Sequence, residues 1–220
     1  IIRIRWYLLP VSFYERRRTG LVGMNNDVIL KSISHSIAVK QKVLLDTELI
    51  QSIRGIADEV IAAYRAGNRV LLAGNGGSAA DAQHIAAEFV GRYAFDRPAL
   101  SSIAFTTDTS MLTAIGNDYG YEQIFRRQLE ANGREGDVFI GISTSGNSPN
   151  VIAALERSRE LGIVSAGLTG QGGGKMRSVC DYCIRIPSES TPRIQECHIL
   201  VGHIICGMVE DTLFGGQISQ

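Results

Sequence analysis

Short apolar runs alternate with helical segments along the chain from residue 70 onward. The runs have the length of buried strands, and segments with helical periodicity separate them. This alternation indicates a parallel β-sheet with helices on both faces, because parallel strands are joined by helical crossovers. The candidate strands span residues 70–73, 102–105, 138–142, 163–168 and 182–186.

Two amphipathic helices are expected before the first strand. In the first, Ile29, Ile33, Ile37 and Leu44 lie near one helical face. The second carries apolar residues at helical spacing between residues 49 and 63 and ends near residue 67. One long helix is expected from residue 193 to about residue 213. Because no linker divides these elements, we expect a single domain over residues 24–220.

Residues 1–23 differ from the rest of the chain in composition. They contain five Arg and one Glu, and Pro10 interrupts their apolar run. No small-residue cleavage site follows, which disfavours a signal peptide. We expect a disordered extension that is not part of the fold.

Charge and hydropathy narrow the class of function. The 22 basic and 22 acidic residues balance, which argues against a dedicated nucleic-acid binder, because such proteins cluster Lys and Arg on phosphates. Continuous apolar stretches fall short of the roughly 20 residues of a membrane span. The four cysteines favour a reducing cytoplasm, and the C-x-x-C of Cys180 and Cys183 fits strand packing better than a metal site, since no second pair follows.

Two loops after candidate strands have the composition of phosphate-binding loops. Residues 74–81 read Gly-Asn-Gly-Gly-Ser-Ala-Ala-Asp, and residues 143–148 read Ser-Thr-Ser-Gly-Asn-Ser. Each leads into a helix, where glycine backbone N–H groups, hydroxyls and the helix dipole suit an anion. The G-K-[ST] of a P-loop is missing, and the acidic residue of a dinucleotide fingerprint does not follow at the usual distance of about 20 residues. A sugar phosphate is the ligand that fits best.

Histidines and carboxylates on two helices supply candidate catalytic or metal-binding groups. His84 and Glu88 are spaced i, i+4, with Asp81 one turn earlier on the same side. On the last helix, His203 lies about 80° from Gln195 and His198 about 60° from it on the other side. Periodicity therefore does not decide which histidine joins Gln195 in a site.

Three motifs together resemble the phosphoheptose isomerases of the sugar isomerase (SIS) domain family. They are Leu-Leu-Ala-Gly-Asn-Gly-Gly-Ser-Ala-Ala-Asp-Ala-Gln-His at residues 71–84, Gly-Ile-Ser-Thr-Ser-Gly-Asn-Ser at 141–148 and Arg-Ile-Gln-Glu at 193–196. The resemblance implies a flavodoxin-like three-layer α/β sandwich with N-terminal helices, and a cytoplasmic homotetramer with active sites between subunits. It also implies conversion of sedoheptulose 7-phosphate to D-glycero-D-manno-heptose 7-phosphate, for lipopolysaccharide heptose synthesis.

The same resemblance implies roles for individual residues. Glu88 is the expected base and His203 the expected acid of an enediol mechanism. Zinc is the implied cofactor, with ligands at His84, Glu88, Gln195 and His203. Glu88 and Gln195 are also expected to contact substrate, together with Asn75, Gly76, Gly77, Ser78, Asn117, Asp118, Ser143, Thr144, Ser145 and Ser148.

Two other classes of function have distinct sequence signatures. A related group binds the bacterial replication initiator as a regulatory partner and lacks the acid and base that match His203 and Glu88. Sugar-phosphate-sensing regulators add a helix-turn-helix domain, for which about 25 residues before the first helix are too few. The enzyme is therefore the favoured interpretation, with the regulatory partner as its alternative.

Overall fold

A computed structural model describes residues 23–215 of the chain. The predicted extension, apart from Gly23, lies outside the described residues. Residues 36–220 include a compact unit that holds the whole sheet, and the chain up to His35 forms a separate unit whose described part is the first half of helix α1.

All five strands of the sheet are parallel, and their order is β2-β1-β3-β4-β5. This is the strand order of flavodoxin-like folds, which confirms the predicted fold class. The candidate strands are confirmed with shifts of one or two residues at their ends. The strands are β1 Val70–Gly74, β2 Ser102–Ala104, β3 Val138–Ile142, β4 Val164–Gly170 and β5 Tyr182–Ile186.

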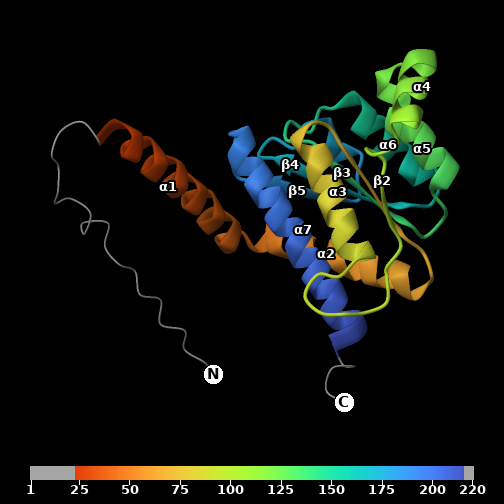
Figure 1. Cartoon of the computed structure of the whole chain (residues 1–220), viewed down its shortest axis with the longest axis horizontal. Helices are drawn as coiled ribbons and strands as arrows, with labels where there is room; N and C mark the ends of the chain where they lie inside the picture. Colours follow the sequence, from red (N-terminus) through yellow and green to blue (C-terminus); the bar gives the residue numbers. More distant parts are fainter. Residues whose placement is uncertain (1–22, 216–220) are drawn as a thin grey trace. The chain divides into compact units, whose positions relative to one another are not determined.

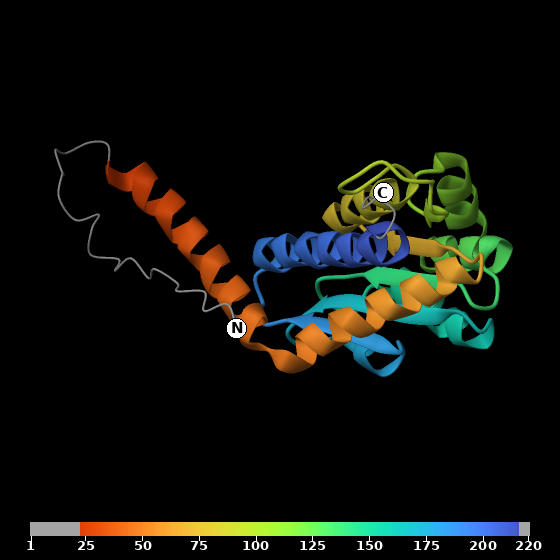
Figure 2. The same cartoon turned by 90° about the horizontal axis from the view of Figure 1, so that it is seen from below.

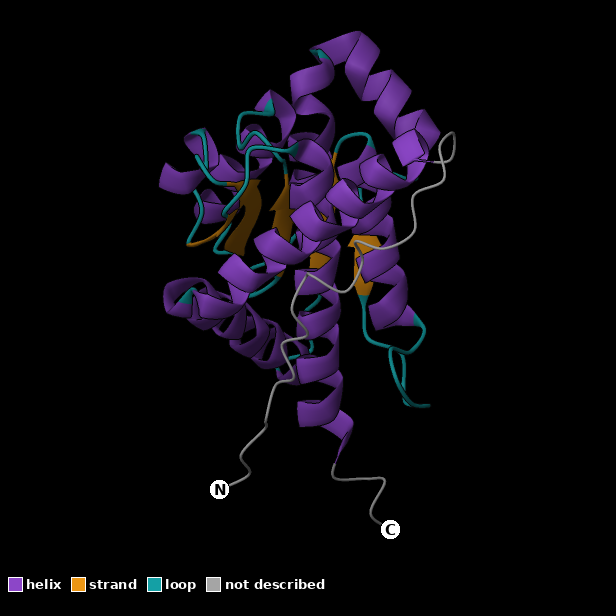
Figure 3. Ribbon diagram, turned by 90° about the vertical axis from the view of Figure 1, so that its left-hand side faces the viewer, coloured by secondary structure: helices purple, strands orange, loops and turns teal. Residues whose placement is uncertain are grey.

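Helices cover both faces of the sheet, which gives three layers (Figure 3). The helices are α1 Gly23–Leu45, α2 Thr47–Arg65, α3 Gly77–Val90, α4 Thr109–Tyr119, α5 Ile124–Asn132, α6 Pro149–Glu160 and α7 Thr191–Phe214, with short 3-10 helices η2 Tyr121–Gln123 and η3 Lys175–Ser178. Val70 and Leu72 of β1 face α2, α3 and α7, whereas Leu71 and Ala73 face α5 and α6. Strands buried on both faces explain the continuous apolar runs.

Helix α2 forms as its sequence predicts. The Asp46 carboxylate caps it by accepting the N–H of Leu49 at 3.0 Å. Its apolar stripe, which includes Ile53, Ile56 and Val60, is buried against the sheet and α7. Figure 2 shows α7 (blue) running along the sheet near α2 (orange).

Helix α1 forms, but its expected apolar face is open. Ile29, Ile33, Ile37 and Leu44 are each between 51% and 65% exposed. The spacing of these residues predicts a stripe and does not reveal what covers it.

Helix α7 is the one described helix that is long and apolar enough to cross a membrane by length and composition. Its apolar window is 44% buried inside the fold, and Cys197, Val201 and Ile205 belong to the core. These contacts are those of a core helix in a three-layer sandwich.

The sheet places two loop ends side by side. Gly74 at the end of β1 is the register partner of Ile142 at the end of β3. Chain connections leave β1 and β3 toward opposite edges of the sheet, so the crevice between their carboxyl ends is the topological switch point, where ligands bind in such folds. Both predicted phosphate loops begin there.

Candidate active site

The first predicted loop turns sharply from β1 into α3. At Gly74 a Cβ atom would come within 2.6 Å of the Ser78 carbonyl oxygen, so only glycine fits there. Helix α3 begins at Gly77, and its N-cap, Gly76, contributes no side-chain cap. The loop therefore presents backbone at the helix N-terminus, while Ser78 is only 3% exposed.

The second predicted loop gathers its hydroxyl groups. Ser143 Oγ lies 2.8 Å from Ser148 Oγ and 3.4 Å from Ser145 Oγ. Ser145 is exposed, Thr144 and Ser148 are half-buried, and Ser148 gives no side-chain cap to α6. These hydroxyls and the uncapped start of α6 form a concentrated set of donors for an anion.

A pair of amide side chains connects the two loops. Asn75 and Asn150 each donate an N–H to the other's side-chain oxygen at 2.9 Å. The Tyr121 hydroxyl donates to Asn75 Oδ1 at 3.1 Å, which adds η2 to the same network. Asn75, predicted to contact substrate, also joins the two ligand loops.

Three predicted metal ligands meet where α3 and α7 pack together. Suitable atoms of His84, Glu88 and His203 all lie within 4.8 Å of one another. His84 Nε2 is 3.0 Å from Glu88 Oε1 and 3.1 Å from His203 Nε2. Two ring nitrogens bound to one tetrahedral zinc at ordinary bond lengths stand about 3.3 Å apart, so the cluster fits such an ion.

Close helix packing brings these side chains together. A Cβ atom at Gly202 would come within 2.5 Å of Ile85 Cδ1, so glycine permits α7 to approach α3 next to His203. Figure 1 shows α3 (yellow) and α7 (blue) side by side in front of the sheet. The Tyr93 ring, 5.7 Å from that of His203, flanks the cluster.

The structure separates the two histidines that periodicity left undecided. His198 is fully buried, and its Nε2 lies 3.1 Å from the Thr169 carbonyl oxygen at the end of β4. Burial lowers the pKa of His198 to about 4. His203, and not His198, is the histidine beside His84.

The buried neutral His198 is expected to make stability depend on pH. The unfolded chain takes up a proton at this residue below about pH 6.5, whereas the folded chain takes it up only near pH 4. The free energy of unfolding should therefore fall as the pH is lowered through this window. Denaturant titrations should show a steeper fall for wild type than for His198→Gln, and parallel curves would contradict the assignment.

Gln195 and Asp81 lie on the same two helices as the cluster. The Gln195 amide packs against Gly77, where a Cβ atom would come within 2.5 Å of Nε2. Gln195 thus lies at the start of α3, eight residues before His203 on α7. Asp81, a turn before His84, has a buried carboxylate oxygen without a hydrogen-bond partner. Burial raises the pKa of Asp81, while His84 acts in the opposite direction.

Asn117 and Asp118 are exposed near the end of α4. Asn117 Nδ2 donates to Asp118 Oδ1 at 2.8 Å. Tyr121, which contacts Asn75, follows three residues after Asp118. The hydrogen bond between Tyr121 and Asn75 connects this part of the chain to the first ligand loop.

A cavity of about 250 Å³ opens beside the hydroxyl loop, at the carboxyl ends of β3, β4 and β5. Thr144 and Ser145 line it, as the sequence predicts for a ligand site. Other lining residues, Gln171, Ser188, Glu189 and Thr191, were missed by the sequence analysis. Their position after β4 and β5 is the signal that could have found them, because every strand of a parallel sheet ends at this edge.

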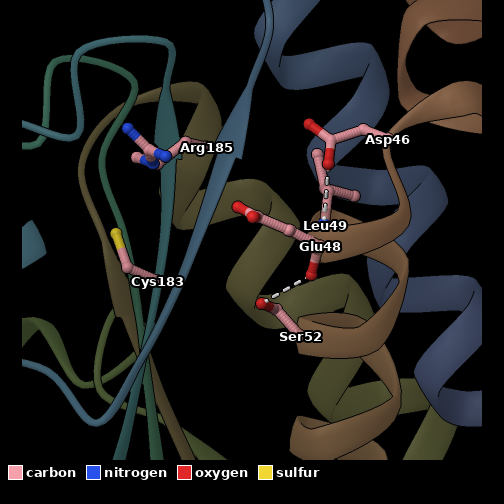
Figure 4. A pocket seen from close by; sticks show the side chains of 6 residues that line it. All are labelled: Asp46, Glu48, Leu49, Ser52, Cys183 and Arg185. Carbon is pink, nitrogen blue, oxygen red and sulfur yellow. Dashed lines mark hydrogen bonds between the residues drawn. The ribbon is translucent and has the colours of Figure 1, made fainter.

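A second, smaller cavity of about 80 Å³ lies at the outer edge of the sheet (Figure 4). Cys183 and Arg185 of β5 line it, opposite Asp46, Glu48 and Ser52. All four cysteines are free. The neighbouring Cys180 is the main factor that lowers the pKa of Cys183 below its usual value. This cavity contains none of the predicted site residues.

Comparisons with known proteins identify the family and the fold. A family model of the SIS domain matches residues 35–170. A phosphoheptose isomerase of Aneurinibacillus thermoaerophilus is 64% identical over 189 residues, which are 86% of this chain and 96% of that protein. Phosphoheptose isomerase 2 of Campylobacter jejuni is 62% identical over 194 residues, 88% of this chain and 96% of that protein. The solved structure of a phosphoheptose isomerase from Neisseria gonorrhoeae aligns with a TM-score of 0.80 at 40% identity, covering 85% of this chain and 99% of that one.

Proposed function

The chain belongs to the SIS domain family and, within it, to the phosphoheptose isomerases, and we propose that it interconverts sedoheptulose 7-phosphate and D-glycero-D-manno-heptose 7-phosphate where α3 and α7 meet. The observation that carries this assignment is the meeting of His84, Glu88 and His203 at one point. The two ligand loops at the switch point supply the phosphate-binding groups. The cluster and the two loops together support this proposal.

The phosphate is held by the hydroxyl loop in this proposal. Ser143, Thr144, Ser145 and Ser148 donate hydrogen bonds to its oxygens, and Ser78 and the backbone of Gly76 and Gly77 complete the contacts. Asn75, Asn117, Asp118 and Gln195 contact the sugar. The open cavity beside Ser145 gives the phosphate access to the loop.

Glu88 and His203 divide the proton transfers. Glu88 removes a proton from C1 of the ketose and returns it to C2, which passes the substrate through an enediol. His203 protonates the oxygen at C2 and then takes up the proton that the C1 hydroxyl loses as the aldehyde forms, so its own protonation state is restored. Glu88 is only partly exposed, with 23% of its side chain accessible, so it is shielded enough to act on carbon.

The three-residue cluster is a possible metal-binding group, and we propose zinc as its ion. His84, Glu88 and His203 would hold it, with Gln195 as the fourth ligand that the family resemblance implies. A bound zinc ion supplies Lewis-acid stabilisation of negative charge on the substrate oxygens.

Separate substitutions of the two histidines of α7 test whether His203 is a zinc ligand and the acid. His203→Gln should lower both the bound zinc and the isomerase rate, because it removes a coordinating nitrogen and a group that protonates oxygen. His198→Gln, the matched control on the same helix, should change neither. Metal analysis and rate assays at equal folded fraction decide, and an inactive His198 variant beside an active His203 variant would overturn the proposal.

We further propose a homotetramer in which α1 contributes to the contacts and active sites lie between subunits. The open apolar side chains of α1, such as Ile37 at 51% and Leu44 at 65% exposure, support it. The free cysteines fit the cytoplasm as the compartment. Heptose synthesis for lipopolysaccharide is the pathway that we propose.

Charge introduced on α1 should weaken the assembly. Ile37→Glu with Leu44→Glu is expected to yield smaller particles in light scattering, because carboxylates would have to be buried at the contact. The matched control is Lys42→Glu, an exposed charged position on the same helix. A double variant that keeps the wild-type mass would exclude this face from the interface.

The alternative is a regulatory partner of the replication initiator without isomerase activity. It requires a site without acid and base, whereas this chain has Glu88 and His203 in contact with His84. Turnover by the wild-type protein discriminates between the two.

A further inference from the structure

A buried ion pair lies beyond the metal-binding cluster. Arg97 lies in the segment between α3 and β2, and Glu210 lies in the last turns of α7. Their side chains are 2% and 1% exposed, and Arg97 Nε donates to Glu210 Oε2 at 2.8 Å. The two residues are 113 positions apart in the sequence.

Arg97 also donates hydrogen bonds to the end of α3 and to its own loop. Its guanidinium donates to the carbonyl oxygens of Glu88 at 2.8 Å, Phe89 at 2.7 Å and Pro98 at 3.0 Å. The carbonyls of the last helical turn have no partner inside the helix and carry the negative end of its dipole. Arg97 therefore holds the backbone of Glu88 directly.

Both carboxylate oxygens of Glu210 accept hydrogen bonds. Its two oxygens accept the N–H groups of Tyr93, Ala94 and Phe95 at 2.6–3.2 Å, in addition to Arg97. Burial by itself would raise the pKa of Glu210, but these donors together hold the pKa below its usual range. The carboxylate is thus charged, and it holds the backbone of residues 93–95.

This pair connects the two helices that carry the proposed catalytic groups. Glu210 follows His203 by seven residues, so both lie within about 20° on the same face of α7. Tyr93, whose N–H binds Glu210, places its ring 5.7 Å from that of His203. Arg97 thus holds the backbone of Glu88, while Glu210 connects it to α7 and to Tyr93, whose ring lies beside His203.

We propose that Arg97 and Glu210 are positioning residues that set the distance of Glu88 and His84 from His203. The inference rests on the proposed function of that cluster. A buried ion pair adds little net stability compared with apolar side chains of similar volume, so its value here lies in geometry. Lysine cannot replace Arg97, because one ammonium group cannot reach four acceptors in a planar fork.

Arg97→Lys tests the proposal against a matched control. Arg157→Lys alters a guanidinium that pairs with Glu130 between α5 and α6, on the other face of the sheet. We expect Arg97→Lys to lower zinc affinity, measured by chelator competition, and kcat by about 10–100-fold, as for other residues that orient metal ligands. KM for sedoheptulose 7-phosphate should stay within about threefold, because Arg97 does not touch substrate. Arg157→Lys should change neither zinc affinity nor kcat.

A measurement on metal-free protein tests the positioning role independently of the proposed isomerase activity. The rings of His84 and His203, 5.0 Å apart, should give a nuclear Overhauser effect in wild type and in Arg157→Lys and lose it in Arg97→Lys. Wild type that shows this contact without turnover contradicts the function and leaves the positioning role standing. Arg97→Lys with wild-type zinc affinity, kcat and ring contact overturns the positioning role.

A second variant guards against failure to fold. Glu210→Gln keeps the size of the side chain and one oxygen that can accept the N–H groups of Ala94 and Phe95, while it removes the charge that faces Arg97. If the pair serves only stability, this variant keeps zinc affinity and kcat. If it positions Glu88 and His203, the variant folds and loses both by about 10–100-fold.

Discussion

Glu88→Gln is expected to lower the isomerisation rate by about 10²–10⁴-fold, the usual contribution of a positioned general base. Glutamine keeps the size of the side chain, but an amide cannot take a proton from C1. Exchange of the C1 hydrogen of sedoheptulose 7-phosphate with solvent deuterium, followed by NMR, measures this step directly.

Glu156→Gln is the matched control for that experiment. Glu156 is an exposed carboxylate on α6 and belongs to neither loop nor cluster. Its variant should exchange hydrogen at the wild-type rate. Wild-type exchange by Glu88→Gln would assign the base to another residue.

Ser145→Glu is expected to abolish substrate binding at ordinary concentrations. Two unit charges about 4 Å apart repel by about 4 kcal/mol at an effective dielectric constant of 20, which is about 10³-fold in affinity. The exposed Ser145 hydroxyl lies within the Ser143 and Ser148 cluster, so a carboxylate there would face the phosphate.

Ser145→Ala separates charge from the loss of the hydroxyl. It removes one hydrogen bond and should weaken binding far less than Ser145→Glu. Calorimetric titration with sedoheptulose 7-phosphate measures both variants. If folded Ser145→Glu keeps wild-type affinity, the phosphate binds elsewhere.

The strands and the place of the ligand loops could be predicted because local sequence signals mark them, whereas the flavodoxin-like arrangement came from the family resemblance. Apolar runs such as residues 138–142 are buried on both faces, and they remain recognisable without knowledge of their neighbours. The glycines and hydroxyls after β1 and β3 mark the switch point for the same reason. The structure confirms the strands and places both loops at adjacent strand ends.

The choice between His198 and His203 could not be made from helical angles. Both residues lie within 80° of Gln195, and only the contact of α7 with α3 at Gly202 places His203 beside His84. His198 instead lies under the end of β4. The position of a residue around one helix does not show which other helix or strand that face contacts.

Polar contacts between residues far apart in the sequence could not be predicted either, because they also depend on how the helices pack. Arg97 and Glu210 read as ordinary charged residues in a loop and a helix, yet both are almost fully buried. Their pairing depends on where the segment after α3 crosses α7. Helix α1 shows the opposite situation. Its apolar stripe is visible in the sequence, but the surface that covers this stripe is not.

Incubation of the full chain with sedoheptulose 7-phosphate in deuterated water tests whether the protein is a phosphoheptose isomerase. NMR of the mixture, with metal analysis of the same sample, follows both substrate and product. We expect D-glycero-D-manno-heptose 7-phosphate to appear with deuterium at C2, while the remaining ketose gains deuterium at C1. Folded, zinc-loaded protein that yields neither aldose nor exchange would contradict this expectation.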